Sequence, residues 1–290
     1  MSLRASLVMA TLGRVAEIDR CVDSLVAQTC RDFELIVVDQ NLDDRLVPVV
    51  ARARALGLIC HHLRQQEPNL CLARNTGIEH ASGDIVAFPD DDCWYEADVV
   101  EQVLTRFERQ QELDGLVIRW VEASNSPAGR LHFDSFAQFR EPVASSITLF
   151  FRRSRLREAG SFDLALGLHS WYGAGEETDL MLRLLRAGAW VDFEPAIWVH
   201  HAIASPASQS PGRMFANARK RARGTGALYA RHSLPVWIVL RGLLSPWPRV
   251  LANTLSPSRA AQMLGQGMGR LEGYVGWRRG YRPGMRRGES

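Results

Sequence analysis

Cysteine is scarce in this chain and is not arranged for a metal site or a disulfide framework. The five cysteines are odd in number, scattered, and without any CxxC pair: Cys21, Cys30, Cys60, Cys71 and Cys93. A disulfide framework needs paired cysteines, and a zinc site needs ligand spacings that are missing here. This cysteine usage is typical of a reducing compartment.

Long apolar runs and a secretory signal are also missing. The longest apolar segment, residues 234–248, is interrupted by Arg241, Pro246 and Pro248. No stretch therefore reaches the roughly 18 apolar residues that span a bilayer. The N-terminal stretch has a short uncharged run between Arg4 and Arg14 and no cleavage site, unlike a signal peptide. We therefore expect a cytoplasmic protein.

Acidic residues are almost absent from the last quarter of the chain. Residues 213–290 hold fifteen Lys and Arg against Glu272 and Glu289, a net charge of +13. Residues 1–212 hold 20 basic and 30 acidic residues, a net charge of −10. The overall composition, with 46% hydrophobic and 23% charged residues, is that of a folded globular protein. We expect an acidic domain over 1–212 and a basic, partly amphipathic extension over 213–290.

Strand-length and helix-length segments alternate through the first two thirds of the chain. Short apolar runs are followed by segments whose apolar residues recur at helical spacing. In chain order we expect strands at 5–10, 33–39, 58–63 and 84–88, and helices at 15–28, 45–56, 70–81 and 95–109. This alternation predicts βαβ units, that is, an α/β fold with a mostly parallel open sheet and helices on both faces.

The second half of the acidic region continues less regularly. Apolar runs at 115–123 and 145–153 predict further strands, and 189–201 predicts one or two more. A helix is expected over 176–188, ending at Gly188, because glycine is the preferred residue for a left-handed helix cap. A loop rich in Pro, Ser and Gly at 205–212 then precedes the basic extension.

Polar residues follow three of the expected strands. Thr11 and Arg14 follow the first, Asp39 and Gln40 the second, and Asp90–Asp92 the strand at 84–88. In an open parallel sheet, ligands bind outside the carboxyl ends of the strands, so these residues should converge. Three adjacent carboxylates repel one another unless a hard cation such as Mg²⁺ or Mn²⁺ is bound. The alternative is a solvated turn that caps the next helix.

Several motifs occur together in one order: "ELIVVDQN", "LARNTGIEHASGDIVAFPDDDCWYEAD", "GEETDLMLRLLRAG" and "WVHH". In order and spacing this set resembles the inverting, nucleotide-sugar-dependent glycosyltransferases of family 2, which have the GT-A fold. The resemblance covers about residues 5–201. It implies sugar transfer from a nucleoside-diphosphate sugar, with UDP- or dTDP-sugars favoured, to a hydroxyl of a glycan or a polyprenyl-linked glycolipid.

The resemblance also implies roles for the residues at the strand ends. Thr11 and Arg14 stand where the family contacts the nucleotide, and Asp39 where it hydrogen-bonds the base. Arg74 stands where a basic residue approaches the diphosphate. Asp90–Asp92 resemble the DXD-type motif, with Asp92 as the metal ligand and Asp91 toward the ribose or sugar. Asp90 is expected either toward the nucleotide sugar or as a further ligand. Without the resemblance, Asp39 reads equally well as a helix N-cap, and Arg74 as a surface partner of Glu79 or Asp84.

The catalytic base is expected at the start of the helix over 176–188. An inverting displacement needs a carboxylate that takes the proton of the acceptor hydroxyl. The family's "GED.D" signature places its base at the position of Glu177, where an Asp is usual. Either the longer Glu177 is accommodated or Glu176 takes the role, with Asp179 orienting the site. The competing interpretation is that all three acids only begin a helix.

Two further pairs are candidates for ligand contact. His200 in "WVHH" fits the place of a third metal ligand better than His201, although a surface role is the commoner fate of such a pair. Trp171 and Tyr172, in the glycine-flanked "HSWYGAG", are candidates to stack on an acceptor sugar. The alternative for these aromatic residues is core packing.

The basic extension combines cations with aromatic residues that favour a membrane interface. We expect it to bind the anionic inner face of the cytoplasmic membrane rather than nucleic acid, because the acidic body opposes wide contact with a phosphate backbone. A solvated tail or a subunit contact is the alternative. For the whole chain, the competing functions are a nucleotidyltransferase on a related fold and a catalytically silent sugar- or lipid-binding module.

Overall fold

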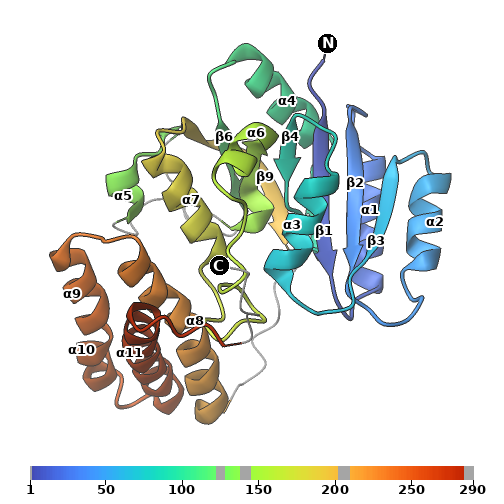
Figure 1. Ribbon diagram of the computed structural model, residues 1–290. Helices are drawn as coiled ribbons and strands as arrows, with labels where there is room; N and C mark the ends of the chain where they lie inside the picture. The colour runs from blue at the N-terminus through green and yellow to red at the C-terminus, as the bar shows by residue number, and fades with distance from the viewer. Residues whose placement is uncertain (1, 122–127, 138–144, 202–209, 284–290) are drawn as a thin grey trace. The chain divides into compact units, whose positions relative to one another are not determined.

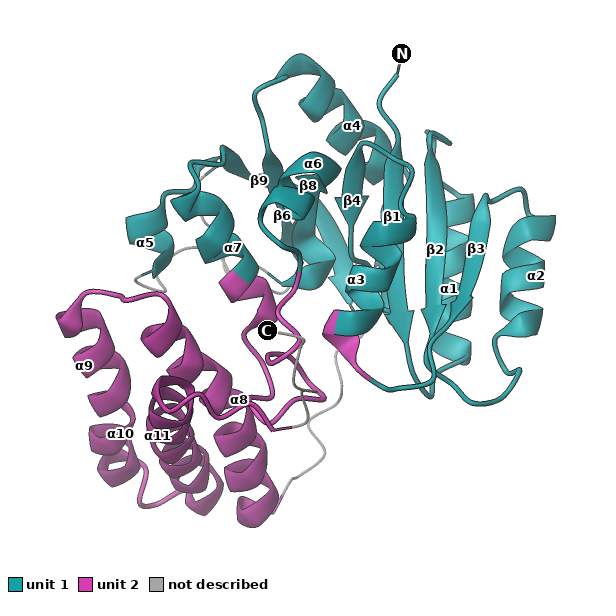
Figure 2. Ribbon diagram, in the orientation of Figure 1, with its two compact units in different colours: residues 1–68, 72–161, 180–203 teal, residues 69–71, 162–179, 204–290 magenta. Residues whose placement is uncertain are grey.

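Two structural units divide the chain (Figure 2). The computed structural model describes residues 2–121, 128–137, 145–201 and 210–283. Unit 1 consists of residues 1–68, 72–161 and 180–203. Unit 2 consists of residues 69–71, 162–179 and 204–290. Unit 2 therefore takes in more than the expected extension over 213–290, because the loop at 162–179 packs with the C-terminal helices.

The described residues of unit 1 form one sheet of nine strands (Figure 1). The strands are β1 (Ala5–Thr11), β2 (Phe33–Asp39), β3 (Cys60–Arg64), β4 (Ile85–Ala87), β5 (Cys93–Tyr95), β6 (Gly115–Trp120), β7 (Gly129–Arg130), β8 (Leu149–Arg152) and β9 (Val191–His201). They are ordered β3-β2-β1-β4-β8-β6-β9-β5, and β7 pairs with β9. Strands β1 to β4 are parallel, whereas β8, β5 and β7 run antiparallel to their neighbours.

The helices that precede residue 187 connect these strands. They are α1 (Ala16–Val26), α2 (Val47–Ala55), α3 (Leu70–His80), α4 (Val99–Arg109), α5 (Phe133–Ala137), α6 (Arg153–Glu158) and α7 (Glu176–Arg186), with a 3₁₀ turn, η1, at Ser146–Thr148. The expected alternation of strands and helices is confirmed, with ends that differ by a few residues. Gly188 follows α7 with φ of 81°, as expected for a left-handed helix cap.

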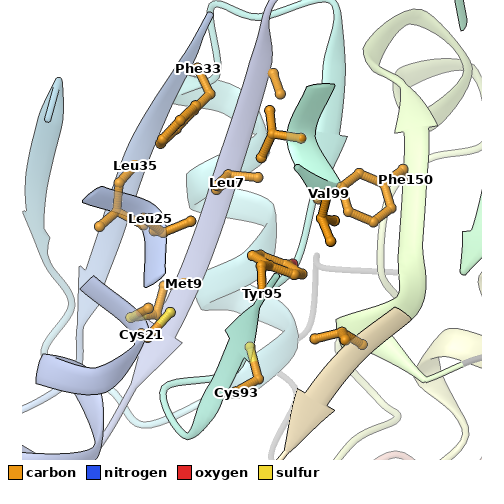
Figure 3. Close-up of a cluster of buried hydrophobic side chains, with 14 of the residues drawn as sticks. Leu7, Met9, Cys21, Leu25, Phe33, Leu35, Cys93, Tyr95, Val99 and Phe150 are labelled. Atoms are coloured by element: carbon orange, nitrogen blue, oxygen red, sulfur yellow. The ribbon is translucent and has the colours of Figure 1, made fainter. Parts of the chain in front are cut away.

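The core of unit 1 lies between the sheet and helices α1, α2 and α4. Figure 3 shows Leu7 and Met9 of β1 beside Leu25 of α1, with Val99 of α4 and Phe150 of β8 in the same cluster. Leu7 and Met9 are two residues apart, so they point to the same face of the strand. All are buried, and each such side chain contributes about 1.5–3 kcal/mol when removed from water.

Helix α3 packs on the opposite face of the sheet. Val8 lies between Leu7 and Met9 and points the other way. Its side chain fills the space beside Gly77 of α3, where an added Cβ would overlap it. Because both faces of β1 are covered, the strand is buried along nearly its whole length rather than at alternate residues. The expected α/β architecture with helices on both faces is confirmed.

Unit 2 contains four C-terminal helices. They are α8 (Pro211–Arg231), α9 (Val236–Leu244), α10 (Pro246–Ala252) and α11 (Pro257–Arg278). Helices α8 and α11 make the most extensive contact (Figure 2). Gly265, Gly269 and Gly273 of α11 lie directly on the α8 backbone, at the carbonyl groups of Phe215, Arg219 and Arg223. A Cβ at any of these glycines would overlap the facing carbonyl, so the two helices meet backbone to backbone.

An apolar stripe remains exposed along α9 and α10. It consists of Val236, Trp237, Leu240, Leu244, Trp247 and Leu251, which recur at helical spacing, and of Leu255 in the turn after α10. Val236 and Leu251 are 72% and 75% exposed. Among the described residues, none of the helices combines the length and the apolar character that a bilayer span requires.

Candidate active site

Thr11, the last residue of β1, and Arg14, which follows the strand, both contact Asp91. The Thr11 Oγ1 donates a hydrogen bond to Asp91 Oδ2 at 2.7 Å, and Arg14 Nη1 donates to Asp91 Oδ1 at 2.6 Å. Arg14 also pairs with Asp92. Burial raises the pKa of Asp91, while the hydrogen bond from Thr11 and the charge of Arg14 act in the opposite direction. The first and third of the expected strand-end groups therefore converge, as the sequence predicts.

Asp90, Asp92 and His201 form a cluster of metal-ligand type. One ligand atom from each lies within 4.8 Å of the others. The pairing of β5 with β9 sets His201 opposite Cys93, beside Asp92. The His201 Nε2 lies 3.0 Å from Asp92 Oδ1, yet this buried oxygen accepts no hydrogen bond among the described residues. Two carboxylates and an imidazole, with one oxygen unsatisfied, fit a hard divalent cation.

The expectation that His200 rather than His201 lies with the carboxylates is wrong. Adjacent residues in a strand point to opposite faces, so only one of the pair can face Asp92. The His200 Nε2 lies 2.6 Å from Glu96 Oε1, and the ring stacks on Trp94 with centroids 5.1 Å apart. His200 therefore belongs to a surface cluster on the other side of β9.

Arg74 lies beside the same carboxylate cluster. Its Nη2 is 3.3 Å from Asp90 Oδ1, and the residue is only 2% exposed. It is therefore not the surface partner of Glu79 or Asp84. A buried guanidinium next to the predicted metal site supplies positive charge where a diphosphate is expected.

Asp39, at the end of β2, is completely buried and tightly hydrogen-bonded. Its Oδ1 accepts from the backbone and side-chain nitrogens of Asn41 at 2.9 and 2.8 Å, which is an Asx-type turn and not a helix cap. Its Oδ2 lies 2.9 Å from His62 Nε2 and 3.1 Å from Arg64 Nη1. Asn41 Oδ1 also accepts from the Gly13 backbone at 2.7 Å, which ties the loops after β1 and β2 together.

Sequence reasoning missed Asn41, His62 and Arg64. Arg64 is the last residue of β3, which pairs parallel to β2 with Arg64 opposite Asp39. The rule that ligand-type residues follow parallel strands applies to β3 as it does to β1 and β2. That rule would have found Arg64 from its position at the end of the apolar run.

Glu176, Glu177 and Asp179 begin α7, as expected, and belong to unit 2. Glu176 is 4% exposed, and a Cβ added to Gly167 would lie 3.5 Å from its Cδ. Glu177 is partly exposed. Asp179 is fully buried, with its Oδ1 2.7 Å from Arg231 Nε and 2.9 Å from His232 Nε2. The end of α8 thus holds the first turn of α7 in place.

Tyr172 is not positioned to stack on an acceptor sugar. It is 1% exposed, and its hydroxyl donates to the Tyr281 carbonyl at 2.6 Å. Its ring packs edge-on against Trp171 and Trp277 because the loop is pressed into the C-terminal helices. Trp171 is partly exposed, with the Arg223 guanidinium 4.4 Å from its ring centroid. It also lines a cavity of about 710 Å³ in unit 2.

Solved structures with the same architecture identify the fold of this chain. The mannosyltransferase PcManGT from Pyrobaculum calidifontis, solved with GDP-Man and Mn²⁺, aligns with a TM-score of 0.65 at 15% identity, covering 96% of this chain and 87% of that one. TarS 1–349 from S. aureus, solved with UDP-GlcNAc, aligns with a TM-score of 0.59 at 15% identity, covering 96% and 92%. The chain therefore has the GT-A fold of nucleotide-sugar-dependent glycosyltransferases.

Sequence relatives place the family. The family profile "Glycosyl transferase family 2" matches residues 6–162, more than half of the chain, so the chain belongs to this family. The glycosyltransferase GlyA of Streptococcus pneumoniae is 26% identical over 146 residues, which is 50% of this chain and 21% of that protein. A PGL/p-HBAD biosynthesis glycosyltransferase of Mycobacterium bovis is 36% identical over 102 residues, 34% of this chain and 39% of that protein. The matched segments thus span less than half of these relatives.

Proposed function

We propose that this chain transfers a sugar, with inversion, from a nucleoside-diphosphate sugar to a hydroxyl of a glycan or glycolipid acceptor. The observation that carries the proposal is the cluster of Asp90, Asp92 and His201 at the edge of the sheet, beside Arg14 and Arg74. Carboxylates and imidazole suit a divalent cation, and the two guanidinium groups suit a diphosphate. Both solved neighbours contain a nucleotide sugar, one of them with Mn²⁺.

The donor site is assigned to the loops after β1, β2 and β4. Asp39 is held rigidly by Asn41, His62 and Arg64, which suits a hydrogen bond to the nucleotide base. We favour a UDP- or dTDP-sugar as donor. Arg14, which is partly exposed, is the cation able to turn from Asp91 and Asp92 to the diphosphate.

Asp92 and His201, with Asp90, would hold Mg²⁺ or Mn²⁺. When bound, the cation would stabilise the departing diphosphate. Asp92 supplies the oxygen that accepts no hydrogen bond among the described residues, and His201 supplies a ring nitrogen on the same side. Each oxygen of Asp91 accepts a hydrogen bond, from Thr11 or from Arg14, whereas Asp92 Oδ1 accepts none among the described residues, so Asp92 is assigned to the metal and Asp91 to the nucleotide.

Glu177 is assigned as the base that takes the proton of the acceptor hydroxyl. It is more exposed than Glu176, whose side chain is packed beside Gly167 and Cys71. The Arg231 guanidinium and the His232 ring hold Asp179 at 2.7 and 2.9 Å and fix the first turn of α7, so the position of Glu177 is defined by the fold. Trp171, at the cavity of unit 2, stays a candidate for acceptor contact.

Release of free nucleoside diphosphate tests the reaction. The full chain would be incubated with UDP-, dTDP- and GDP-sugars and with acceptor glycolipids, with Mn²⁺ or with EDTA, and the anomeric configuration of the product determined. Metal-dependent release and an inverted product are expected. No release from any donor would favour a silent binding module, and release of inorganic diphosphate from a nucleoside triphosphate would favour a nucleotidyltransferase.

The apolar stripe on α9 and α10 supports association with an anionic membrane surface. Trp237 and Trp247 are of the type that lies at the headgroup level, and residues 213–271 contain no acidic residue that would repel the lipid. Such a face binds by burying its apolar side chains while nearby Arg residues attract anionic headgroups, each contributing about 1 kcal/mol.

Flotation with vesicles tests this association. The full chain should float with vesicles that contain phosphatidylglycerol and less with pure phosphatidylcholine. A Leu240→Glu and Leu251→Glu double variant should lose flotation, whereas Leu42→Glu, an exposed leucine of unit 1, should not. Equal flotation of both variants and the parent would defeat the membrane assignment.

A further inference from the structure

A cleft of about 690 Å³ lies within unit 2, lined by the loop at 168–174 and by helices α8 and α11. The cationic side chains that line it are Lys220, Arg221 and Arg270. Thr225, Gln262 and Gln266 add neutral hydrogen-bond donors. None of the described residues that line the cleft carries a carboxylate. Figure 2 shows α8 and α11, which form its helical walls, side by side.

No acidic residue of α8, α9 or α10, or of α11 before Glu272, balances the positive charge of this cleft. Residues 213–271 contain no acidic residue. Glu272, the acid of α11, is already engaged by Arg219, whose Nε lies 2.8 Å from Oε1, and by Arg223, whose Nε lies 2.8 Å from Oε2. In the described part of the chain, no carboxylate pairs with Lys220 or Arg221. Neighbouring cations in a cleft repel one another unless an anion lies between them.

Lys220 is held at the cleft by the glycine loop. Gly173 has φ of 71°, and a Cβ added to it would lie 2.7 Å from Lys220 Cγ and 2.8 Å from the Lys220 carbonyl oxygen. The loop therefore rests on α8 at Lys220 and fixes where its side chain emerges. Burial and then the charge of Lys220 lower the pKa of the nearby His169, so the field of the ammonium group is felt at the rim.

Arg270 is likewise fixed. Its Nη1 donates to the Gly242 carbonyl at 2.6 Å and to Ser245 Oγ at 3.2 Å, where α9 ends. These are neutral acceptors, so they orient the guanidinium without cancelling its charge. The cleft thus presents the fixed Arg270, the outward-reaching Lys220 and Arg221, and hydroxyl and amide donors. This set matches a phosphate better than it matches a carboxylate, because a phosphate has more oxygens and a larger charge.

We propose that this cleft binds the phosphate or diphosphate group of a larger ligand, with Lys220 and Arg221 as the contacting cations and Arg270 as the fixed one. The cleft is larger than a phosphate alone, so the ligand extends beyond that group. The proposal concerns unit 2 only and does not depend on the glycosyl transfer proposed above.

Lys220 offers a direct chemical test because it is the only lysine among the 35 basic residues. The aldehyde of pyridoxal 5′-phosphate condenses with its amine, releasing water, and borohydride reduces the imine to a stable secondary amine. Pyridoxal reacts in the same way but lacks the phosphate. Relative to the N-terminal amine of the same molecule, Lys220 should be labelled on the order of tenfold faster by the phosphate-bearing reagent than by pyridoxal. Equal ratios for the two reagents would overturn the proposal.

Competition experiments and variants test whether the faster labelling of Lys220 by the phosphate-bearing reagent arises in the cleft. Inorganic diphosphate should protect Lys220 at concentrations where sodium chloride of equal ionic strength does not. Arg221→Ala should reduce the advantage of the phosphate-bearing reagent at Lys220. Arg259→Ala removes an equal charge from an exposed position of α11 that does not line the cleft and should leave the advantage unchanged. If both variants lost the advantage of the phosphate-bearing reagent equally, or if sodium chloride protected Lys220, the faster labelling would come from the overall positive charge and not from a binding site.

The same labelling assay distinguishes a soluble phosphate ligand from a lipid headgroup. Protection by soluble nucleoside diphosphate but not by vesicles would assign a soluble ligand. Protection by vesicles containing phosphatidate, but not by phosphatidylcholine vesicles, would assign a lipid headgroup. Isothermal titration with diphosphate should show retention of binding in Lys220→Arg and loss in Lys220→Gln. Protection by none of these phosphates would refute the site.

Discussion

In unit 1 the carboxylates at the strand ends have cationic partners beside them, whereas in helices α8 to α11 of unit 2 many cations accompany one acid, Glu272. Asp91 and Asp92 have Arg14 and His201 beside them. In unit 2, Glu272 is shared by Arg219 and Arg223, and other cations lie on aromatic rings, such as Arg282 over Trp277 at 3.4 Å. The difference agrees with the two proposals above, a cation site at the strand ends of unit 1 and a phosphate site in unit 2.

The two units also differ in how they are packed. Unit 1 buries interlocking side chains between a sheet and helices, as Figure 3 shows. In unit 2, Gly265, Gly269 and Gly273 of α11 lie directly on backbone carbonyl groups of α8. A core of side chains can adjust to a small change, but a backbone contact cannot. The predictions below test this contrast in function and in packing.

The largest expected effect separates donor binding from transfer. Glu177→Gln in unit 2 should lower the rate of transfer by roughly 10²–10⁴, the typical contribution of a general base, while donor affinity is kept. Asp92→Asn in unit 1 should abolish Mn²⁺-dependent donor binding itself. Turnover and calorimetric donor affinity would be measured for both, with Glu176→Gln as the matched control. Near-normal turnover of Glu177→Gln would show that Glu177 is not the base.

Packing of unit 2 should be highly sensitive to a side chain added at the glycine positions between α8 and α11. Gly269→Val places a branched side chain against the Arg219 carbonyl and should lower the free energy of unfolding by about 3 kcal/mol. Gly212→Ala, in the first turn of α8 with open space around it, should change stability little or raise it. Denaturant titration followed by tryptophan fluorescence would compare them, and equal stabilities would contradict the backbone contact.

The histidine pair of β9 should differ in metal dependence. His201→Ala should raise the Mn²⁺ concentration needed for half-maximal activity by at least roughly tenfold, since even outer partners of a metal site contribute that much. His200→Ala removes only the contact with Glu96 and Trp94 and should leave the requirement near that of the parent. If His200→Ala raised the Mn²⁺ requirement and His201→Ala did not, His200 would be the metal ligand instead.

The smallest effect concerns a buried carboxylate away from the site. Burial of Glu34 opposes its ionisation, but hydrogen bonds from Ser6 and Ser82 and the charge of His61 bring its pKa below the ordinary 4.5. A lowered pKa means stability that is present above pH 4.5 and lost as the pH falls through the folded-state value. Glu34→Gln should therefore cost about 1 kcal/mol at pH 7 and progressively less below pH 4.5. A cost independent of pH would show that charge is not involved.

Much of unit 1 follows from the sequence because local pattern and sheet position agree there. The apolar runs at β1 and β2 give the strands, and the rule for carboxyl ends brings Thr11 together with Asp91. The choice between His200 and His201 could not be made locally, since it depends on which face of β9 meets Asp92, and that is set by pairing with β5.

The sequence was a poorer guide to unit 2. Tyr172 in a glycine-flanked loop resembles an exposed aromatic, and only the contact of that loop with Trp277 and Tyr281 shows that it is core. The same contact explains why residues 162–179 group with the C-terminal helices, where a change of composition at 212 had suggested the boundary. Long-range packing of this kind leaves no periodic signal in the chain.

The glycine seam has one more consequence. Gly265, Gly269 and Gly273 meet residues 215, 219 and 223, so both sides repeat every four residues in the same direction. A slip of α11 by one helical turn would again place glycine against α8 backbone, and the seam alone does not select a register. Glu272 removes this degeneracy, because its carboxylate reaches Arg219 and Arg223 together in only one alignment. Glu272, the one acidic residue of α11 in the described chain, thus fixes the register of α11 against α8.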